Sequence, residues 1–373
     1  VERYQELAAE YPKSRDYAWG LAAATKGLAW QTSSAIDSVE RRQSLLKQSV
    51  EAWSRCLKLN PQDAKALQER ASVYWMLGDV KSAQADMERA IECDPGNPDH
   101  YAQICRLLRN EISAGAKVLE YAEQAVRLDP ENADYRVELA VILANQRKKN
   151  ASFAQLQKAL ELDPKCVAAH CRLSRHHLRQ RNFDQAMAHA DQAVELNPLD
   201  PVGYYFRGLV YGDLYENPKA LKDLDRALEL SPREGAIRSY RADILCRLER
   251  YEEAEEEYTA AIHDRPAGWH VYKRRAALRF KFKRYAESMA DLREALRRNP
   301  GDVGTVTWIS PTFVAKCPSS EFRDGMKALA DEAVQLNKGS ADSRMARATL
   351  LNALGDFAKA TADLEAAHAK SPD

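Results

Sequence analysis

Residues 204–232 read YYFRGLVYGDLYENPKALKDLDRALELSP, and this stretch decides the fold of the chain. Small residues stand at Gly208, Ala220 and Ala227, where a larger side chain would overpack two helices that approach closely. Pro232 closes the stretch, and because the residue before a proline is pushed out of the α region, this proline ends a helix. The stretch therefore predicts a pair of packed helices joined by a turn.

Prolines recur along the chain with the length of this helix pair. The recurring residues are Pro61, Pro95, Pro130, Pro164, Pro198, Pro232, Pro266 and Pro300. Successive prolines stand one period of about 34 residues apart, with one residue more between Pro95 and Pro130. Pro372 follows Pro300 by two periods plus four residues. A fixed period of this length marks stacked repeats, so the sequence predicts a helical solenoid over nearly the whole chain.

The repeat resembles the tetratricopeptide (TPR) repeat, as found in bacterial multi-repeat arrays. Its template is W-x2-L-G-x2-Y, then A-x3-F, then P. Matching positions are Tyr204, Gly208, Tyr211, Ala220, Leu224, Ala227 and Pro232. Arg207 departs from the template, which has Leu there. The resemblance implies an all-α fold, a right-handed superhelical α-solenoid of about ten helix–turn–helix units.

The period also predicts how the chain is divided. We expect a partial N-terminal repeat, stretched by an insertion between its helices, at residues 1–63, and seven regular repeats at 64–300. An irregular repeat with Pro311 and Pro318 is expected at 301–338, and a C-terminal repeat at 339–373. Half a repeat at the start and no polar helix after the last one lead us to expect a segment of a longer protein.

Charge argues against nucleic acid and membranes as partners. Lys and Arg together number 55, as do Asp and Glu, so no net field attracts either. The basic run KRRAALRFKFKR at 273–284 follows an acid-rich stretch, and we interpret its charges as paired within the chain or solvated. No apolar run in the sequence is long enough to cross a bilayer, so we expect no membrane insertion.

Cysteines and histidines do not form a recognisable metal site. The seven cysteines stand singly without a C-x-x-C, which indicates buried thiols in a reducing, cytoplasmic setting. One crowded stretch contains Cys166, His170, Cys171, His176, His177 and His189, but its spacing fits no standard zinc pattern. We interpret these as packing residues. Catalytic motifs such as G-x-S-x-G and H-E-x-x-H are missing, so we predict no enzyme activity and no cofactor.

The resemblance also implies where a partner binds. In TPR proteins the first helix of each repeat lines a concave groove. The groove positions nominate Arg172, Arg175, Arg179, Tyr205, Asp243, Arg247, Lys273, Phe280 and Lys281. Arginine binds carboxylates as a fork, and aromatic rings take apolar side chains. Our hypothesis is an extended acidic peptide or a C-terminal carboxylate in this groove.

The resulting functional prediction is a non-enzymatic protein–protein interaction scaffold whose partner is a protein or peptide. An alternative remains open. The opening RYQELAAEYP at residues 3–12 resembles TPR tails that follow serine/threonine kinase domains in some bacterial proteins. The chain would then be the regulatory or targeting segment of a larger signalling enzyme, such as a bacterial serine/threonine kinase.

Overall fold

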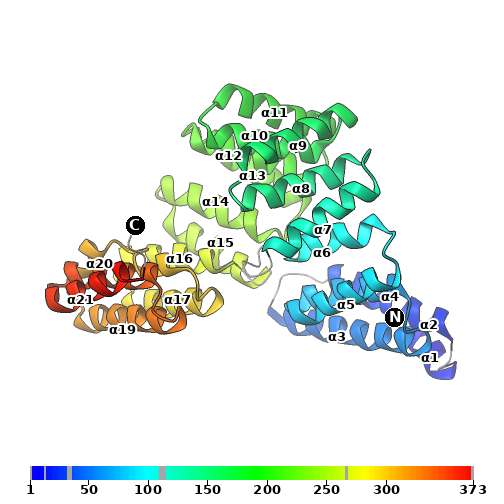
Figure 1. Cartoon of the computed structure of the whole chain (residues 1–373), viewed down its shortest axis with the longest axis horizontal. Helices are drawn as coiled ribbons and strands as arrows, with labels where there is room; N and C mark the ends of the chain where they lie inside the picture. The colour runs from blue at the N-terminus through cyan, green and yellow to red at the C-terminus, as the bar shows by residue number, and fades with distance from the viewer. Residues whose placement is uncertain (1, 12–13, 32–35, 109–114, 265–267, 371–373) are drawn as a thin grey trace. The chain divides into compact units, whose positions relative to one another are not determined.

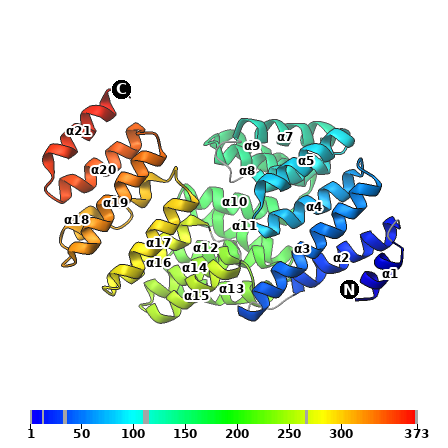
Figure 2. The ribbon, with the colours of Figure 1, turned by 90° about the horizontal axis from the view of Figure 1, so that it is seen from below.

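The computed structural model describes residues 2–11, 14–31, 36–108, 115–264 and 268–370. Every described element is a helix, and this part of the chain contains no strand. The all-α solenoid predicted from the proline period is therefore confirmed. The chain divides into two compact segments, residues 1–230 and residues 231–373. Figures 1 and 2 show the helices from two directions.

The first segment is a stack of helix pairs that follow one another along the chain (Figure 1). Each second helix of a pair also contacts the first helix of the next pair, as α5 does with α6 and α9 with α10. The helices are α1 Glu2–Glu10, α2 Arg15–Gln31, α3 Ile36–Leu59, α4 Ala64–Leu77, α5 Val80–Cys93, α6 Pro98–Leu108, α7 Gly115–Leu128, α8 Ala133–Asn145, α9 Lys149–Leu162, α10 Val167–Arg179, α11 Phe183–Leu196, α12 Pro201–Asp213 and α13 Asn217–Leu230.

The second segment continues the same pattern and breaks it once. Its elements are α14 Gly235–Arg247, α15 Tyr251–Asp264, α16 Trp269–Lys281, α17 Tyr285–Arg298, the 3₁₀ helix η2 Val303–Thr305, α18 Pro311–Ala315, α19 Ser320–Leu336, α20 Ala341–Ala353 and α21 Phe357–His368. In the irregular repeat, η2 and the five-residue α18 stand in place of a full first helix. Pro311 begins α18, because a proline fits only the first turn of a helix.

The first repeat is longer than the others. Its helices α2 and α3 have 17 and 24 residues, whereas the helices of the regular repeats have 11 to 14. The insertion expected between them falls partly on residues 32–35, which lie outside the described residues. The predicted repeat boundaries stay predictions.

Among the described residues, the turn inside seven repeats contains a residue with left-handed backbone. Gly78 and Gly355 take this place with φ of 82° and 83°. Five non-glycine residues take it in other repeats, each one repeat period after the last and with φ of 59–62°: Arg147, Arg181, Tyr215, Glu249 and Lys283. The next residue donates its N–H back into the first helix, as Asn182 does to the His177 carbonyl over 2.9 Å. This is the Schellman arrangement that closes a helix.

Small residues hold the two helices of a repeat close together, as the sequence predicted. A Cβ added to Gly208 would lie 3.2 Å from Cγ of Leu224 and 3.5 Å from the Ala220 carbonyl oxygen. Ala220, Leu224 and Ala227 are completely buried. Close packing of this kind leaves no space for an added methyl group without displacement.

Arg207, which departs from the repeat template, is held by two carboxylates. Its guanidinium donates to Asp223 on α13 over 2.7 and 2.9 Å, and to Asp191 on α11 over 3.1 Å. An Arg on a first helix with an Asp sixteen residues later recurs in three other repeats. These pairs are Arg70–Asp86, Arg275–Asp291 and Arg347–Asp363. Arginine in place of the template leucine therefore belongs to a recurring Arg–Asp pair that links the two helices of one repeat.

Candidate protein-binding surface

The first helices α8, α10 and α12 lie in succession in the first segment, and each contacts the next. Arg175 and Arg179 lie one turn apart on α10, and both side chains are exposed. Burial lowers the pKa of Arg179, and the neighbouring charge of Arg175 lowers it further. The two guanidinium groups thus act on each other, and neither has a carboxylate partner among the described residues.

Arg172 and Tyr205, which the sequence also nominated, pack around one ring. The guanidinium of Arg172 lies 5.6 Å from the ring centroid of Phe206 on α12. Tyr205 meets the same ring edge-on at 5.4 Å between centroids. Together with buried Cys171, these aromatic residues form a small apolar cluster between α10 and α12. The structure therefore brings Arg172 and Tyr205 together at Phe206, with Arg175 and Arg179 further along the same helix α10.

Four further cations lie at the ends of α8 and α10 and at the start of α9, and the groove positions did not include them. Arg147, Lys148, Lys149 and Arg181 lie in or beside the turns that follow α8 and α10, and all four are exposed. We name these four together with Arg175 and Arg179 the basic cluster. Burial lowers the pKa of His176, and His177, Arg179 and Lys149 lower it further, which places both cations near this ring.

The basic cluster is recognisable in the sequence as a local excess of Lys and Arg, which the groove positions alone do not reveal. Residues 139–183 contain nine Lys and Arg but two Asp and Glu, within a chain whose charges balance. A sliding count of charge would have found it. Several of these residues lie at the turns rather than on the groove face, which is why the template did not nominate them.

In the second segment, Lys273 is enclosed rather than exposed. It is 4% exposed, and its ammonium donates to the Asp302 carboxylate over 2.7 Å. The nitrogen also lies 4.3 Å from the ring centroid of Trp269 and 4.4 Å from that of Trp308. An ammonium between two indole faces and a carboxylate is strongly held. Lys273 therefore joins α16 to the irregular repeat.

The other nominated residues of the second segment also make contacts inside the fold. Asp243 accepts a hydrogen bond of 2.6 Å from the Tyr258 hydroxyl and pairs with Arg274. Phe280 packs on Phe322 with 5.1 Å between ring centroids, and Lys281 lies 3.8 Å from the ring centroid of Tyr251. Arg247 is exposed at the end of α14. A peptide-binding role for these residues stays a prediction.

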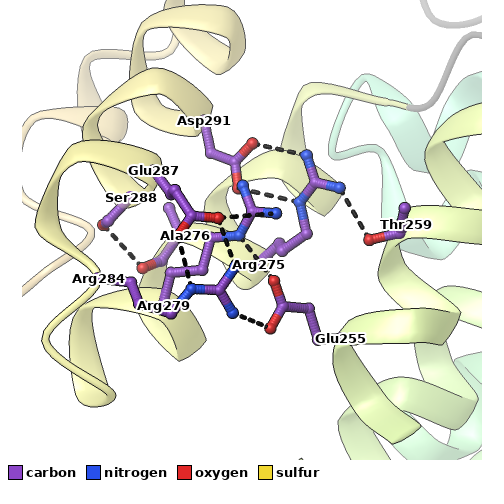
Figure 3. Close-up of polar contacts among 9 residues, drawn as sticks. All are labelled: Glu255, Thr259, Arg275, Ala276, Arg279, Arg284, Glu287, Ser288 and Asp291. Carbon is purple, nitrogen blue, oxygen red and sulfur yellow. Dashed lines mark hydrogen bonds and ion pairs between the residues drawn. The ribbon is translucent and has the colours of Figure 1, made fainter. Parts of the chain in front are cut away.

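The basic run 273–284 is largely neutralised by carboxylates of its own segment (Figure 3). Arg275 donates to Asp291 over 2.7 and 3.0 Å, and Arg279 donates to Glu255 over 2.9 Å and to Asp291 over 3.0 Å. Arg284 donates to Glu287 over 2.7 Å. The interpretation of this run as charge paired within the chain is confirmed. It offers little free basic surface to a partner.

The histidines nominated as packing residues do pack on one another. Nδ1 of His170 lies 3.0 Å from Nδ1 of His189, and the rings of His177 and His189 stack at 5.6 Å between centroids. His176 stacks on Phe153 at 4.6 Å. Within the described ranges, no group of three or more His, Cys, Asp or Glu side chains is placed to hold a metal ion.

The cysteines are free thiols, and five of the seven are buried. Burial raises the pKa of Cys56 to about 11 and that of Cys171 to about 12. Because the thiolate is the reactive form, these two thiols are unreactive at neutral pH. Of the helices described here, none has both the length and the apolar character needed to span a membrane.

A pocket of about 380 Å³ opens between α2, α3 and α4. Its walls are mostly apolar, with Trp19 edge-on to Trp53 at 4.6 Å and Met76 beside them. Lys26 and Glu69 also line it and form an ion pair of 2.6 Å. The repeat template does not predict this pocket, because its residues come from the stretched first repeat and the repeat after it.

Comparison with solved structures shows the same fold in other proteins, whereas no curated protein matches the sequence. A chain of the APC/C hetero-tetramer Cut9–Hcn1 has a TM-score of 0.56 at 16% identity, covering 91% of this chain and 67% of that one. Yeast Tom70 has a TM-score of 0.54 at 17% identity, covering 100% and 89%. The human IFIT1 dimer with PPP-AAAA has a TM-score of 0.53 at 16% identity, covering 96% and 91%. At such identities the likeness concerns the fold alone.

The family model of the tetratricopeptide repeat matches the sequence six times. The matches cover residues 38–98, 119–165, 150–201, 171–233, 206–268 and 241–303, which is more than half of the chain. They agree with the observed helix pairs, the small residues between them and the regular spacing of the turns. The chain belongs to the tetratricopeptide repeat family.

Proposed function

We propose that this TPR array is a protein–protein interaction scaffold that binds an extended segment of a partner along α8, α10 and α12. The membership in a family of repeat proteins with extended binding surfaces supports a binding role. The succession of contacts among these three helices supports one continuous surface within the first segment. The proposed role is binding, without a catalytic step.

One observation carries the proposal. Most first-helix arginines are committed to carboxylates inside the fold, as Arg207 is to Asp223 and Arg275 to Asp291. Arg175 and Arg179 have no described carboxylate partner and are exposed on α10. A guanidinium that the fold does not use can form a fork with a carboxylate of another molecule. Tyr205, half-buried on α12, would contact an apolar side chain of the same segment.

The proposed surface lies within the first segment and includes no residue of the second. Lys273 is enclosed by Trp269, Trp308 and Asp302, so we leave it out. Among the solved neighbours, the human IFIT1 dimer contains PPP-AAAA. A fold shared at 16% identity does not transfer a ligand, and we propose a protein partner.

The test is affinity capture of partners by the full chain, read by mass spectrometry. Wild type is compared with Arg175→Ala/Arg179→Ala and with a control, Lys222→Ala/Arg293→Ala, which removes two exposed cations elsewhere. A partner captured by wild type and control but lost by the first variant supports the proposal. Hydrogen exchange of the complex should then show protection in α8, α10 and α12. Equal capture by all three proteins, with protection elsewhere, would exclude this surface.

A further inference from the structure

We propose that the basic cluster binds an acidic segment of a partner protein, rich in Asp and Glu side chains. The inference rests on the proposed function and specifies the chemistry of its partner. It adds Arg147, Lys148, Lys149 and Arg181 to the residues that contact the partner.

The cluster is a local excess of charge in a neutral chain. Nine Lys and Arg against two Asp and Glu give residues 139–183 a formal charge of +7, while the whole chain has 55 of each sign. The two acids, Glu161 and Asp163, lie at the far end of α9, away from the turns that carry the cluster. Helix α10 has no acid at all. This part of the fold therefore lacks carboxylates of its own to neutralise the cluster.

The contacts agree with the composition. None of the six cluster side chains forms an ion pair with any described residue. In the second segment, by contrast, Lys273, Arg275, Arg279 and Arg284 all donate to carboxylates. The nearest acid after α10 in sequence, Asp184, is exposed at the start of α11 and pairs with none of the six. The fold pairs the basic run at 273–284 with carboxylates and leaves the basic cluster exposed.

The cations of the cluster lie on helices and turns that neighbour one another in the first segment. Helix α10 contacts both α8 and α9, and Figure 1 places these helices side by side. Arg175 and Arg179 stand on consecutive turns, about 5–6 Å apart at Cβ. Arg147 and Arg181 occupy the same left-handed place in successive turns, with φ of 61° and 59°. His176, stacked on Phe153, is close enough to both Lys149 and Arg179 for each charge to lower its pKa.

The surface fits carboxylates better than nucleic acid. Single-stranded nucleic acid is held by aromatic platforms on which bases stack, in addition to basic side chains. The phenylalanines of residues 139–183 are Phe153 and Phe183, and both are partly buried. Among the histidines of this stretch, His176 is already stacked on Phe153 and His177 on His189. Within residues 139–183, cations whose neighbouring rings are already packed or stacked match an extended chain of carboxylates.

The experiment measures binding of the full chain to three fluorescent probes by polarisation. The first probe is a twelve-residue peptide of alternating Asp and Glu with Gly spacers. The second is the same peptide with Asn and Gln, and the third is a single-stranded oligouridylate of equal charge. The tested variant is Lys149→Gln/Arg175→Gln/Arg179→Gln, because Gln keeps the aliphatic stem and helix propensity. The matched control is Lys47→Gln/Lys222→Gln/Arg293→Gln, three exposed cations outside the cluster.

We expect wild type and control to bind the acidic peptide alike, and the neutral peptide at least tenfold more weakly. The tested variant should lose affinity for the acidic peptide by at least about tenfold, and binding should weaken as salt rises. Equal binding by the tested and control variants would overturn the proposal. So would tighter binding of the oligouridylate than of the acidic peptide. If the acidic peptide does not bind but a captured partner still protects α10, this inference fails and the scaffold function stands.

Discussion

Nδ1 of His170 lies 3.0 Å from Nδ1 of His189, close to the place where other repeats hold an arginine–aspartate pair. His189 stands one repeat period before Asp223, so it takes the position of that carboxylate on its own second helix. The carbonyl oxygen of Pro164 can only accept, so His170 donates to it through Nε2 over 3.1 Å. Nδ1 of His170 can then accept a hydrogen bond from Nδ1–H of His189.

The burial of His189 beside His170 predicts a loss of stability in mild acid. Burial, followed by His170 and His177, lowers the pKa of His189 to about 4, below the value of about 6.5 for an unfolded histidine. The unfolded state thus binds the proton more readily, so the stabilisation is present above about pH 6.5 and is lost as pH falls toward about 4. Because the ring is half-buried, we expect a loss of about 1–2 kcal/mol. Urea unfolding at pH 7.5, 5.5 and 4.5 measures it.

The matched variants for this prediction are His189→Asn and His368→Asn. Asn can donate to His170 but does not titrate in this range, so the first should flatten the pH dependence of stability. His368 is exposed on α21, and its replacement should change nothing. An unchanged pH dependence in His189→Asn would show that the loss comes from other groups.

The pair Arg207–Asp223 predicts a strong asymmetry between single and double substitutions. Asp223 is 5% exposed and accepts both fork bonds from Arg207. Asp223→Leu leaves a largely buried guanidinium without its main partner, which should cost about 3 kcal/mol. Arg207→Leu/Asp223→Leu restores the template residue and replaces the ion pair by apolar packing, so it should recover most of that loss. Chemical denaturation of the two variants measures both values, and equal stability would contradict the prediction.

The left-handed turns predict opposite effects of glycine in two repeats. A Cβ on Gly355 would meet nothing within 4 Å, so the effect of Gly355→Ala comes only from its φ of 83°. We expect that substitution to destabilise by about 1 kcal/mol. Glu249 is exposed at the same place with φ of 61°. Glu249→Gly should relieve this strain and stabilise by up to about 1 kcal/mol. Thermal unfolding measures both, and Glu249→Ala, which keeps the strain, is the control and should show no gain.

The repeat architecture could be predicted from sequence alone, because its determinants are local and periodic. A proline such as Pro232 restricts the residue before it and so ends a helix locally. Gly208 is required by a contact between the two helices of one repeat. Arg207 was seen only as a departure, since its carboxylate partners lie on two different second helices. A search for Arg and Asp sixteen residues apart would have revealed that pairing.

The candidate surface was less predictable, because it depends on contacts between repeats. The template assigns the same groove positions in every repeat. Whether a lysine at such a position is exposed or buried depends on side chains of adjacent repeats, which the period does not specify. Lys273 occupies a groove position and is nonetheless enclosed, because Asp302 and Trp308 come from the one repeat whose first helix is replaced. The period locates the irregular repeat at residues 301–338 but does not predict which of its side chains meet Lys273.

The last prediction concerns Lys273, because a structural role and a partner-binding role of this residue lead to different results. Lys273→Met keeps the stem between the rings of Trp269 and Trp308 but leaves the Asp302 carboxylate with Thr305, whose hydroxyl donates to it over 2.8 Å. Losing the ammonium should destabilise the protein by about 2–3 kcal/mol. It should also change tryptophan emission, since both rings lose their cation. If Lys273 is a structural residue, the folded variant captures partners as wild type does. Loss of a partner at unchanged stability would instead restore Lys273 to the binding surface.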